Sequence, residues 1–321
     1  MKNKCLVLGG GGFIGSNLVE GLLNSGYDVR VFDVKNFSKR NIEEFIDRIE
    51  VVEGDFNNPM DVQSAIDGVD YVYHLISTTL PANSVLNPCY DIESNLVPTI
   101  KLLQLCVEKS IKKIIFISSG GTVYGMPETI PIKESHVSNP INSYGITKRT
   151  IESYLYLYHK LWGLDVCIFR LSNPYGKRQN PKGTQGVIPV FLYKAIHQET
   201  IEIWGDGSVI RDYIHISDVI GILTKAITIE TPEIIYNLGS GIGTSLNEIL
   251  DLIKEHLEPG LKFNYLEARS FDVKANVLDV NLLQERFGFH NSVTLKNGIT
   301  ELHKVLKNEI RFSEQTFVIN F

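Results

Sequence analysis

Cysteine is scarce in this chain, and internal repeats, low-complexity tracts and long blocks of like charge are missing. The four cysteines are Cys5, Cys89, Cys106 and Cys167; no two form a C-x-x-C pair, and three lie inside apolar runs. This spacing argues against a disulfide framework and against a cysteine metal site. We therefore predict reduced thiols that behave as small buried apolar groups, and no metal.

An excess of basic residues is missing too, because 31 Lys and Arg stand against 37 Asp and Glu. With a net charge of −6 and no basic stripe, the sequence does not predict nucleic-acid binding. No run of about 18 apolar residues occurs, and the apolar run that begins at Cys5 is too short for the core of a signal peptide. We expect a cytoplasmic protein with neither nucleic acid nor membrane as a partner.

Short apolar segments alternate with helical patterns through the first half of the chain, which is typical of a parallel sheet. We predict strands at 4–8, 29–33, 50–53, 71–75, 113–118 and 166–171, and helices at 14–25, 60–66, 90–109 and 143–161. Beyond residue 176 the pattern is less regular, with a strand at 200–204 and a helix at 245–256. The predicted class is α/β: a Rossmann-type, doubly wound parallel sheet of six or seven strands with a smaller C-terminal α/β region.

Three glycines follow the first predicted strand and open the first predicted helix. Gly9, Gly12 and Gly15 have the spacing G-x-x-G-x-x-G. Gly9 permits a tight turn, Gly12 lets a pyrophosphate approach the backbone, and Gly15 allows close packing of helix on sheet. The helix N-terminus adds free N–H groups and the positive end of its dipole. The segment is predicted to bind a dinucleotide.

Asp33 ends the second predicted strand, 18 residues after Gly15. A carboxylate there accepts hydrogen bonds from both ribose hydroxyls and repels a 2′-phosphate, so NAD is favoured over NADP. Lys39 and Arg40 lie nearby and leave NADP as the lesser alternative. Asp55 follows the third strand and is interpreted either as an adenine contact or as an ordinary turn residue.

Tyr144 and Lys148 are four residues apart on a predicted helix, so their side chains share one face. An ammonium group favours the phenolate form of a tyrosine, and a phenolate is a general base. Lowering a tyrosine pKa from about 10 to about 7 takes about 4 kcal/mol, which we assign to Lys148 together with a cationic nicotinamide ring. The pair is predicted to be catalytic.

The motifs together resemble the extended short-chain dehydrogenase/reductases, specifically the nucleotide-sugar epimerase/dehydratase branch, over nearly the full length of the chain. The resemblance implies NAD as cofactor, bound by residues 1–172 with a return at 212–240, and a nucleotide-sugar site in residues 173–321. It rests on the Gly9–Gly15 loop, Asp33, Gly54-Asp55, His74-Leu75, the segment Ser118-Ser119-Gly120-Gly121-Thr122-Val123-Tyr124-Gly125, Tyr144 with Lys148, Asn173-Pro174, and Arg211-Asp212-Tyr213.

The resemblance assigns roles residue by residue. Tyr144 exchanges a proton with a sugar hydroxyl, and Lys148 holds the nicotinamide ribose. The implied cofactor set is Gly9, Gly12, Phe13, Ile14, Gly15, Asp33, Asp55, Leu75, Ile76, Ser77, Tyr144, Lys148 and Ser172. The implied substrate set is Ser119, Gly120, Asn173, Gly186, Val187, Glu202, Ile203, Trp204, Arg211, Arg269 and Asp272, in which Arg211 clamps the diphosphate.

One position departs from the pattern of the resemblance. Close relatives carry Ser or Thr where this chain has Gly120, so Ser119, Thr122 or a water takes over contact with the reacting hydroxyl, and we favour Thr122. The acid and base that dehydratases carry at 121 and 122, and the Glu that decarboxylases carry at 122, are missing as well. Asn276 is expected to leave room for an N-acetyl group at the sugar's 2-position.

The resemblance therefore predicts a UDP-hexose 4-epimerase that acts through a transient 4-keto sugar. Three alternatives stay open: a 4-keto-sugar reductase, a non-catalytic dinucleotide sensor, and a UDP-uronic acid 4-epimerase in which Lys177, Arg178 or Lys182 reaches the carboxylate. The resemblance also implies a homodimer through the helices at 90–109 and 143–161. The second helix carries an apolar stripe, Ile151, Tyr154, Leu155 and Tyr158, which faces either the dimer partner or the sheet.

Overall fold

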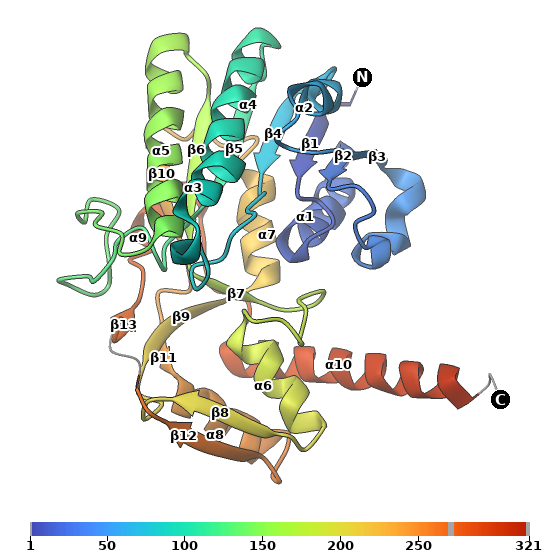
Figure 1. The fold of residues 1–321 in the computed structure, drawn as a ribbon, viewed down its shortest axis with the longest axis vertical. Helices are drawn as coiled ribbons and strands as arrows, with labels where there is room; N and C mark the ends of the chain where they lie inside the picture. Colours follow the sequence, from blue (N-terminus) through green and yellow to red (C-terminus); the bar gives the residue numbers. More distant parts are fainter. Residues whose placement is uncertain (1, 269–272, 319–321) are drawn as a thin grey trace.

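The computed structural model describes residues 2–268 and 273–318, and its centre is a seven-stranded sheet (Figure 1). The strand order is β10-β6-β5-β4-β1-β2-β3, and all neighbouring strands are parallel. The strands are β1 (Lys4–Leu8), β2 (Asp28–Asp33), β3 (Glu50–Glu53), β4 (Tyr71–His74), β5 (Lys113–Ser119), β6 (Val166–Leu171) and β10 (Ile235–Leu238). The predicted α/β class with a doubly wound sheet is confirmed.

The order of the strands also indicates where a ligand binds. The chain runs outward from β1 through β2 to β3, and then returns to place β4 on the other side of β1. Open parallel sheets bind ligands outside the carboxyl ends of their strands, at the point where this order reverses. The loops that follow β1 and β4 are therefore the expected position of a site.

Helices cover both faces of the sheet, because each presents an apolar stripe to it (Figure 1). On one face α1 (Phe13–Asn24) packs beside α7 (Ile216–Lys225), with α9 (Asn281–Phe287) against β10. On the other face lie α2 (Pro59–Ile66), α4 (Val97–Glu108) and α5 (Ser143–Trp162). The stripe predicted on α5 packs on this face: Ile151, Leu155 and Tyr158 are buried, and Tyr154 packs against the same cluster. Of the two interpretations of this stripe, packing against the sheet is the one that the structure supports.

The helix predicted at 90–109 has a more complex form. It consists of α3 (Pro88–Asp91), the π-helical segment η4 (Ile92–Leu96) and α4, with Asn87 capping the start by accepting a hydrogen bond from the Tyr90 amide at 3.1 Å. The π-helical segment widens the helix where buried polar groups meet beneath it. Three short 3₁₀ segments, η1 (Lys39–Asn41), η2 (Glu43–Arg48) and η3 (Ser84–Leu86), lie in loops after β2 and β4.

A second lobe lies below the carboxyl ends of the sheet in the view of Figure 1. Its strands β7 (Asn173–Tyr175), β9 (Ile210–His215), β11 (Gly243–Ser245) and β13 (Ala275–Asn276) form a small sheet, and β8 (Thr200–Trp204) pairs with β12 (Lys262–Leu266). The helices α6 (Val187–Ile196), α8 (Leu246–His256) and α10 (Leu295–Val318) pack around a separate core. Ser245 and Glu248 form a capping box at the start of α8. Within the described residues, we find no helix long and apolar enough to cross a membrane.

Candidate active site

The turn between β1 and α1 has the conformation that its glycines predict. Gly9 has a φ of +83°, and a Cβ atom at Gly15 would lie 2.1 Å from the Gly9 carbonyl oxygen. Both positions therefore require glycine. Gly12 is the N-cap of α1 and has no side chain with which to cap the helix. The turn thus fits a pyrophosphate, which binds the free N–H groups of a helix N-terminus.

Asp33 and Asp55 lie at the ends of neighbouring strands but have different surroundings. Asp33 accepts a hydrogen bond from the Gly11 amide at 2.9 Å, which orients its carboxylate beside the glycine turn. Asp55 accepts hydrogen bonds from the amide and the side chain of Asn57 at 2.9 and 3.1 Å. These bonds make Asp55 a turn residue, and its contact with adenine stays a prediction.

The two cations that left NADP open are both paired with carboxylates. Lys39 Nζ lies 2.9 Å from Glu53 Oε1, and Arg40 Nη2 lies 2.9 Å from Glu309 Oε2. Since both neighbouring cations are engaged by carboxylates, the end of β2 has the acidic character that favours unphosphorylated ribose.

A cavity of about 590 Å³ lies at the carboxyl ends of β1, β5 and β6 and extends to β8 and β9 of the second lobe. Thirteen of the predicted cofactor, catalytic and substrate positions line it: Phe13, Ile14, Ser119, Thr122, Tyr144, Ser172, Asn173, Gly186, Val187, Glu202, Ile203, Trp204 and Arg211. Arg211 also donates to the carbonyl oxygens of Ile210 and Val273 at 2.8 and 2.7 Å.

The other predicted positions lie beside the cavity or outside the described residues. Leu75 and Ile76 lie within 3.5 Å of where a Cβ at Gly9 would be, so this loop packs against the glycine turn. Those that do not line the cavity are Gly9, Gly12, Gly15, Asp33, Asp55, Leu75, Ile76, Ser77, Gly120 and Lys148. The predicted pair Arg269 and Asp272 lies outside the residues that the structure describes.

Tyr144 and Lys148 lie on the first two turns of α5, with Lys148 Nζ 5.7 Å from the centre of the Tyr144 ring. Lys148 is buried, donates to the Ile117 carbonyl oxygen at 3.0 Å and stands 4.7 Å from the centre of the Phe116 ring. Ser77, from the loop after β4, hydrogen-bonds to the Tyr144 side chain. The pair therefore adjoins both the cavity and the predicted cofactor loop.

Burial opposes ionisation of both side chains. It raises the pKa of Tyr144 to about 12, although the Ser77 hydrogen bond acts in the opposite direction. It lowers the pKa of Lys148 to about 8, against the effect of the carboxylates of Asp91 and Glu152. Lys148 alone is thus insufficient to make a phenolate at neutral pH, and a further positive charge beside the phenol is required.

Thr122 and Gly120 have distinct environments although they are two residues apart. Thr122 Oγ1 is buried in the cavity wall and has no hydrogen-bond partner among the described residues. A Cβ at Gly120 would lie 2.6 Å from Leu278 Cδ1 and 3.0 Å from the Arg170 carbonyl oxygen, so this position faces the core. The glycine is explained by packing.

Asn276 lies behind the cavity wall, and the hypothesis that it leaves room beside the sugar stays a prediction. Asn276 is 1% exposed and absent from the cavity wall. Its side chain donates to the Gly120 carbonyl oxygen at 3.1 Å. This side chain therefore supports the segment after β5 from behind and does not shape the sugar pocket directly.

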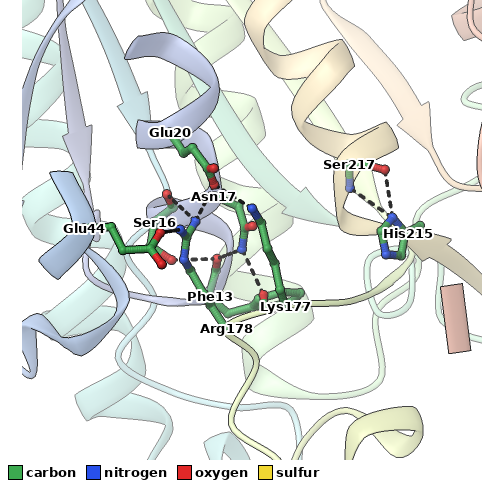
Figure 2. Close-up of polar contacts among 9 residues, drawn as sticks. All are labelled: Phe13, Ser16, Asn17, Glu20, Glu44, Lys177, Arg178, His215 and Ser217. Atoms are coloured by element: carbon green, nitrogen blue, oxygen red, sulfur yellow. Dashed lines mark hydrogen bonds and ion pairs between the residues drawn. The ribbon is translucent and has the colours of Figure 1, made fainter. Parts of the chain in front are cut away.

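The basic residues expected to reach a uronic acid point elsewhere. Figure 2 shows Lys177 and Arg178 directed at α1, where both bind Glu20, at 2.8 and 2.7 Å. Arg178 also bonds Glu44 at 3.1 Å, and Lys182 Nζ lies 5.2 Å from the centre of the Tyr193 ring. Among the described residues, none of these three basic side chains lines the cavity, so the structure does not support this alternative.

No role was predicted from the sequence for some polar residues of the cavity wall, among them Tyr213 and Gln179. Tyr213 and Gln179 line the cavity, and Tyr213 Oη and Gln179 Oε1 are buried without a hydrogen-bond partner in the described part of the chain. Tyr213 had a signal, because it is two residues after Arg211 on β9 and strand residues at this spacing share a face. Gln179 lies in an irregular loop, where no periodicity indicates direction.

A Rossmann-type sheet, a glycine turn at the N-terminus of α1, an acidic residue at the end of β2 and a Tyr-Lys pair together define an NAD-binding α/β enzyme. The model of the NAD dependent epimerase/dehydratase family matches residues 5–239, and the chain belongs to this family.

Relatives with full-length coverage have related activities in their names. The chain is 36% identical over 307 residues, 95% of this chain and 99% of the relative, to a "Putative UDP-glucose 4-epimerase" of Methanocaldococcus jannaschii. It is 31% identical to an Escherichia coli dTDP-4-dehydro-6-deoxyglucose reductase, over 95% of this chain and 98% of the relative. The structure of Thermotoga maritima UDP-glucose 4-epimerase with UDP-glucose has a TM-score of 0.90, 30% identity, and coverage of 96% of this chain and 99% of that one.

Proposed function

We propose that the protein is an NAD-dependent 4-epimerase of a UDP-hexose, either UDP-glucose/UDP-galactose or the N-acetylated pair. The observation that carries the proposal is the composition of the cavity wall around Tyr144. Thr122 offers a buried, unpaired hydroxyl there, and positions 121 and 122 of the wall carry no acid. Among the described residues that line the cavity, the one acidic residue is Glu202, which comes from β8 of the second lobe. Dehydration and decarboxylation call for an acid or base in addition to the tyrosine, whereas epimerisation needs only one proton shuttle.

In the proposed reaction Tyr144 takes the proton from the C4 hydroxyl and returns it after the sugar has turned over. NAD supplies, when bound, a nicotinamide ring that accepts and returns the C4 hydrogen with its electron pair, and a positive charge that favours the phenolate. Lys148 adds the second positive charge from within the fold. The Thr122 hydroxyl gains a hydrogen-bond partner in the sugar hydroxyl and so orients it.

Epimerisation also requires that the nucleotide is held while the sugar is free to rotate. The distribution of polar groups in the cavity supports this division. Arg211 of β9 provides the guanidinium group for a diphosphate, and Ile203, Trp204 and Val187 provide an apolar wall for the nucleoside. Arg269 and Asp272 remain part of the proposed substrate set.

We assign cofactor binding to residues 1–172 with a return at 212–240, and nucleotide-sugar binding to residues 173–321. The packing of α7 on α1 and the pairing of β10 with β6 support the return. Residues 278–289 also contribute Leu278, Leu283 and Phe287 to the core of the sheet. The cofactor-binding domain therefore includes this later segment of the chain as well.

We further propose a homodimer through α5 and the helix at 88–108. The contact would use the face of α5 that points away from the sheet, and not the stripe that contains Ile151 and Leu155. Ile146, Leu157 and Leu161 are exposed and share one side of that helix. Tyr90 and Val97 are exposed on the neighbouring helix. Apolar side chains gathered over two adjacent helices support an interaction surface.

The test is conversion of UDP-glucose, UDP-N-acetylglucosamine and UDP-glucuronic acid in separate reactions, followed by proton NMR and by absorbance of reduced nicotinamide. We expect an axial 4-hydroxyl product from a UDP-hexose without net change of the cofactor. Conversion of UDP-glucuronic acid alone would contradict the proposal.

Tyr144→Phe should lower kcat by about 10²–10⁴-fold while cofactor still binds, because only the proton shuttle is removed. Tyr156→Phe, on the exposed face of the same helix, is the matched control and should leave kcat unchanged. Equal activity of the two variants would exclude the phenolate mechanism.

The second candidate is a 4-keto-sugar reductase, favoured by the full-length similarity to the Escherichia coli reductase. It would use the same Tyr144 and Lys148 but consume reduced cofactor stoichiometrically. Net oxidation of added NADH with a nucleotide-linked 4-keto sugar would identify it.

A further inference from the structure

A buried carboxylate that the proposed reaction does not use lies directly behind the Tyr-Lys pair. Asp91, the last residue of α3, is 0% exposed. Its Oδ2 accepts hydrogen bonds from Ser143 Oγ at 2.7 Å and Thr147 Oγ1 at 2.8 Å. These donors immediately precede Tyr144 and Lys148 in the sequence. One carboxylate oxygen therefore holds the two residues of α5 next to the catalytic ones.

The other carboxylate oxygen binds the opposite wall of the site. Asp91 Oδ1 accepts hydrogen bonds from Thr79 Oγ1 and from Asn95 Nδ2, the second at 3.1 Å. Asn95 Oδ1 in turn accepts from the Thr78 amide at 2.9 Å. The Ser77 hydroxyl donates to the Thr79 carbonyl oxygen at 3.1 Å. This chain of bonds connects α5 to the loop after β4, which carries the predicted cofactor residues.

We propose that Asp91 is a positioning residue of the active site, whose buried carboxylate fixes the first two turns of α5 against the Ser77–Thr79 loop and so sets the place of Tyr144 and Lys148. This inference rests on the proposed proton shuttle of Tyr144. It also explains why an acidic residue, Asp91, lies in the interior behind Tyr144 and Lys148.

Helix capping does not explain the carboxylate, because Asn142 already caps α5 by accepting a hydrogen bond from the Gly145 amide at 2.8 Å. Nor does an ion pair, because the four donors to Asp91 are hydroxyl and amide groups. A carboxylate accepts all four of these bonds, whereas an amide side chain brings donors of its own to the same place. What distinguishes Asp91 from an ordinary buried acid is that two of its donors are the residues that precede Tyr144 and Lys148.

The charge of Asp91 acts on both catalytic groups. It raises the pKa of Lys148 against the larger effect of burial, and it adds to burial in raising the pKa of Tyr144. The Asp91 carboxylate therefore favours the ammonium form of Lys148 and disfavours the phenolate form of Tyr144. Removal of the charge should move the ionisation of both groups to lower pH.

The other charged and titratable groups around the pair are accounted for. Glu152 lies one turn further along α5 and raises the pKa of Lys148, but it is itself paired with Arg170 of β6 at 2.7 Å. His74 of β4 stays neutral at ordinary pH, since burial and the nearby Lys148 lower its pKa to about 3. Asp91 is thus the acid near the pair that has no cationic partner at ion-pair distance among the described residues.

The test compares Asp91→Asn, which keeps the shape and removes the charge, with Asp91→Ala and with Ser143→Ala and Thr147→Val, which each remove one donor. We expect Asp91→Ala to lower kcat by up to about 100-fold with a small change in KM, because misplacement of a catalytic group by about 1 Å has this effect. Asp91→Asn should displace the whole pH–rate profile to lower pH. Each single-donor variant should lower kcat less than Asp91→Ala.

Asp218→Asn is the matched control, because Asp218 is also buried and accepts from neutral donors, the side chain of Ser292 and the amides of Ser292 and Val293. We expect it to lower stability without moving the pH–rate profile. If Asp91→Asn behaved in the same way, Asp91 would be structural only and the proposal would be overturned.

Amide hydrogen exchange separates this inference from the proposed function. In the cofactor-bound protein without sugar, Asp91→Ala and Asp91→Asn should speed exchange of the amides of residues 143–148, whereas Tyr144→Phe should not. Unchanged exchange in the Asp91 variants would refute the positioning role even if the enzyme proved to be an epimerase. Faster exchange in the Asp91 variants of a protein that converts no hexose would instead support the positioning role of Asp91 and contradict the proposed epimerase function.

Discussion

Replacement of Lys148 by Met is expected to stabilise the fold at neutral pH while it abolishes catalysis. The lysine is buried, and burial lowers its pKa from 10.5 to about 8. At pH 7 the protein therefore holds a charged ammonium group in an environment that disfavours the charge. Methionine has a similar length and no charge, so it removes that unfavourable contribution.

The magnitude follows from the pKa. A fall from 10.5 to about 8 corresponds to about 3 kcal/mol of unfavourable free energy for the charged form in the folded state. The Ile117 carbonyl oxygen loses its hydrogen bond from Nζ in the variant, at about 1 kcal/mol. Lys148→Met should therefore be about 2 kcal/mol more stable than the parent protein at pH 7.

The stability difference between Lys148→Met and the parent protein should change sign as the pH rises. Between pH 8 and 10.5 the unfolded chain holds the lysine proton and the folded chain does not, so the stability of the parent protein rises with pH in this window. Above pH 10.5 neither state carries the charge, and the lost hydrogen bond makes the variant less stable by about 1 kcal/mol. The free energies of unfolding of the two proteins should therefore cross.

Urea denaturation of cofactor-free protein at pH 7, 9 and 11 measures this difference. Lys113→Met is the matched control, since Lys113 is equally buried but donates to the carbonyl oxygens of Ala226 and Ile229 and pairs with Asp165 at 3.3 Å. That variant should be destabilised at pH 7. The reasoning fails if Lys148→Met is no more stable than the parent at pH 7, or if the difference between them does not depend on pH.

Two further substitutions test the packing around the site. Gly120→Ser introduces the residue type that the resemblance leads us to expect, but its Cβ would lie 2.6 Å from Leu278 Cδ1. We expect urea denaturation to show a loss of about 1–3 kcal/mol of stability, with no gain in kcat. A faster enzyme would contradict the conclusion that residue 120 faces the core. Arg170→Met leaves Glu152 buried without its bidentate partner and should lower the free energy of unfolding by about 3–5 kcal/mol. The double variant with Glu152→Met should lose less stability, because no unpaired charge remains buried. A double-mutant cycle that shows no coupling energy between the two positions would contradict this reasoning.

The sheet, the cofactor turn and the Tyr-Lys pair could be predicted because each depends on local sequence. Apolar segments at strand length predict β1 to β6, and the glycines predict a tight turn in which Gly9 has a positive φ and Gly15 has no room for a Cβ. The spacing of Tyr144 and Lys148 sets their common face once α5 is helical. The π-helical segment after Asp91 has no such local pattern; its buried residues Ser94 and Asn95 make hydrogen bonds to the loop after β4, which is distant in sequence.

Predictions of side-chain direction in irregular segments were less successful for a physical reason. Lys177 and Arg178 lie in a loop, and their direction depends on Glu20, more than 150 positions earlier in the sequence (Figure 2). Asn276 lies on a two-residue strand, and its side chain donates a hydrogen bond to Gly120, which belongs to the other lobe. Such long-range contacts are decided by the packed fold and leave no periodic trace in the sequence.

The distribution of unpaired polar atoms is itself an argument for a polar ligand. In the described part of the chain, six buried side-chain atoms have no hydrogen-bond partner, and three of them, on Thr122, Gln179 and Tyr213, line the cavity beside Tyr144. Each unpaired group costs about 1–3 kcal/mol, so evolution removes such groups from cores unless something satisfies them. A ligand that brings hydroxyl and phosphate oxygens to these three positions would recover that free energy on binding. The fold thus retains local instability where the sugar nucleotide is proposed to bind.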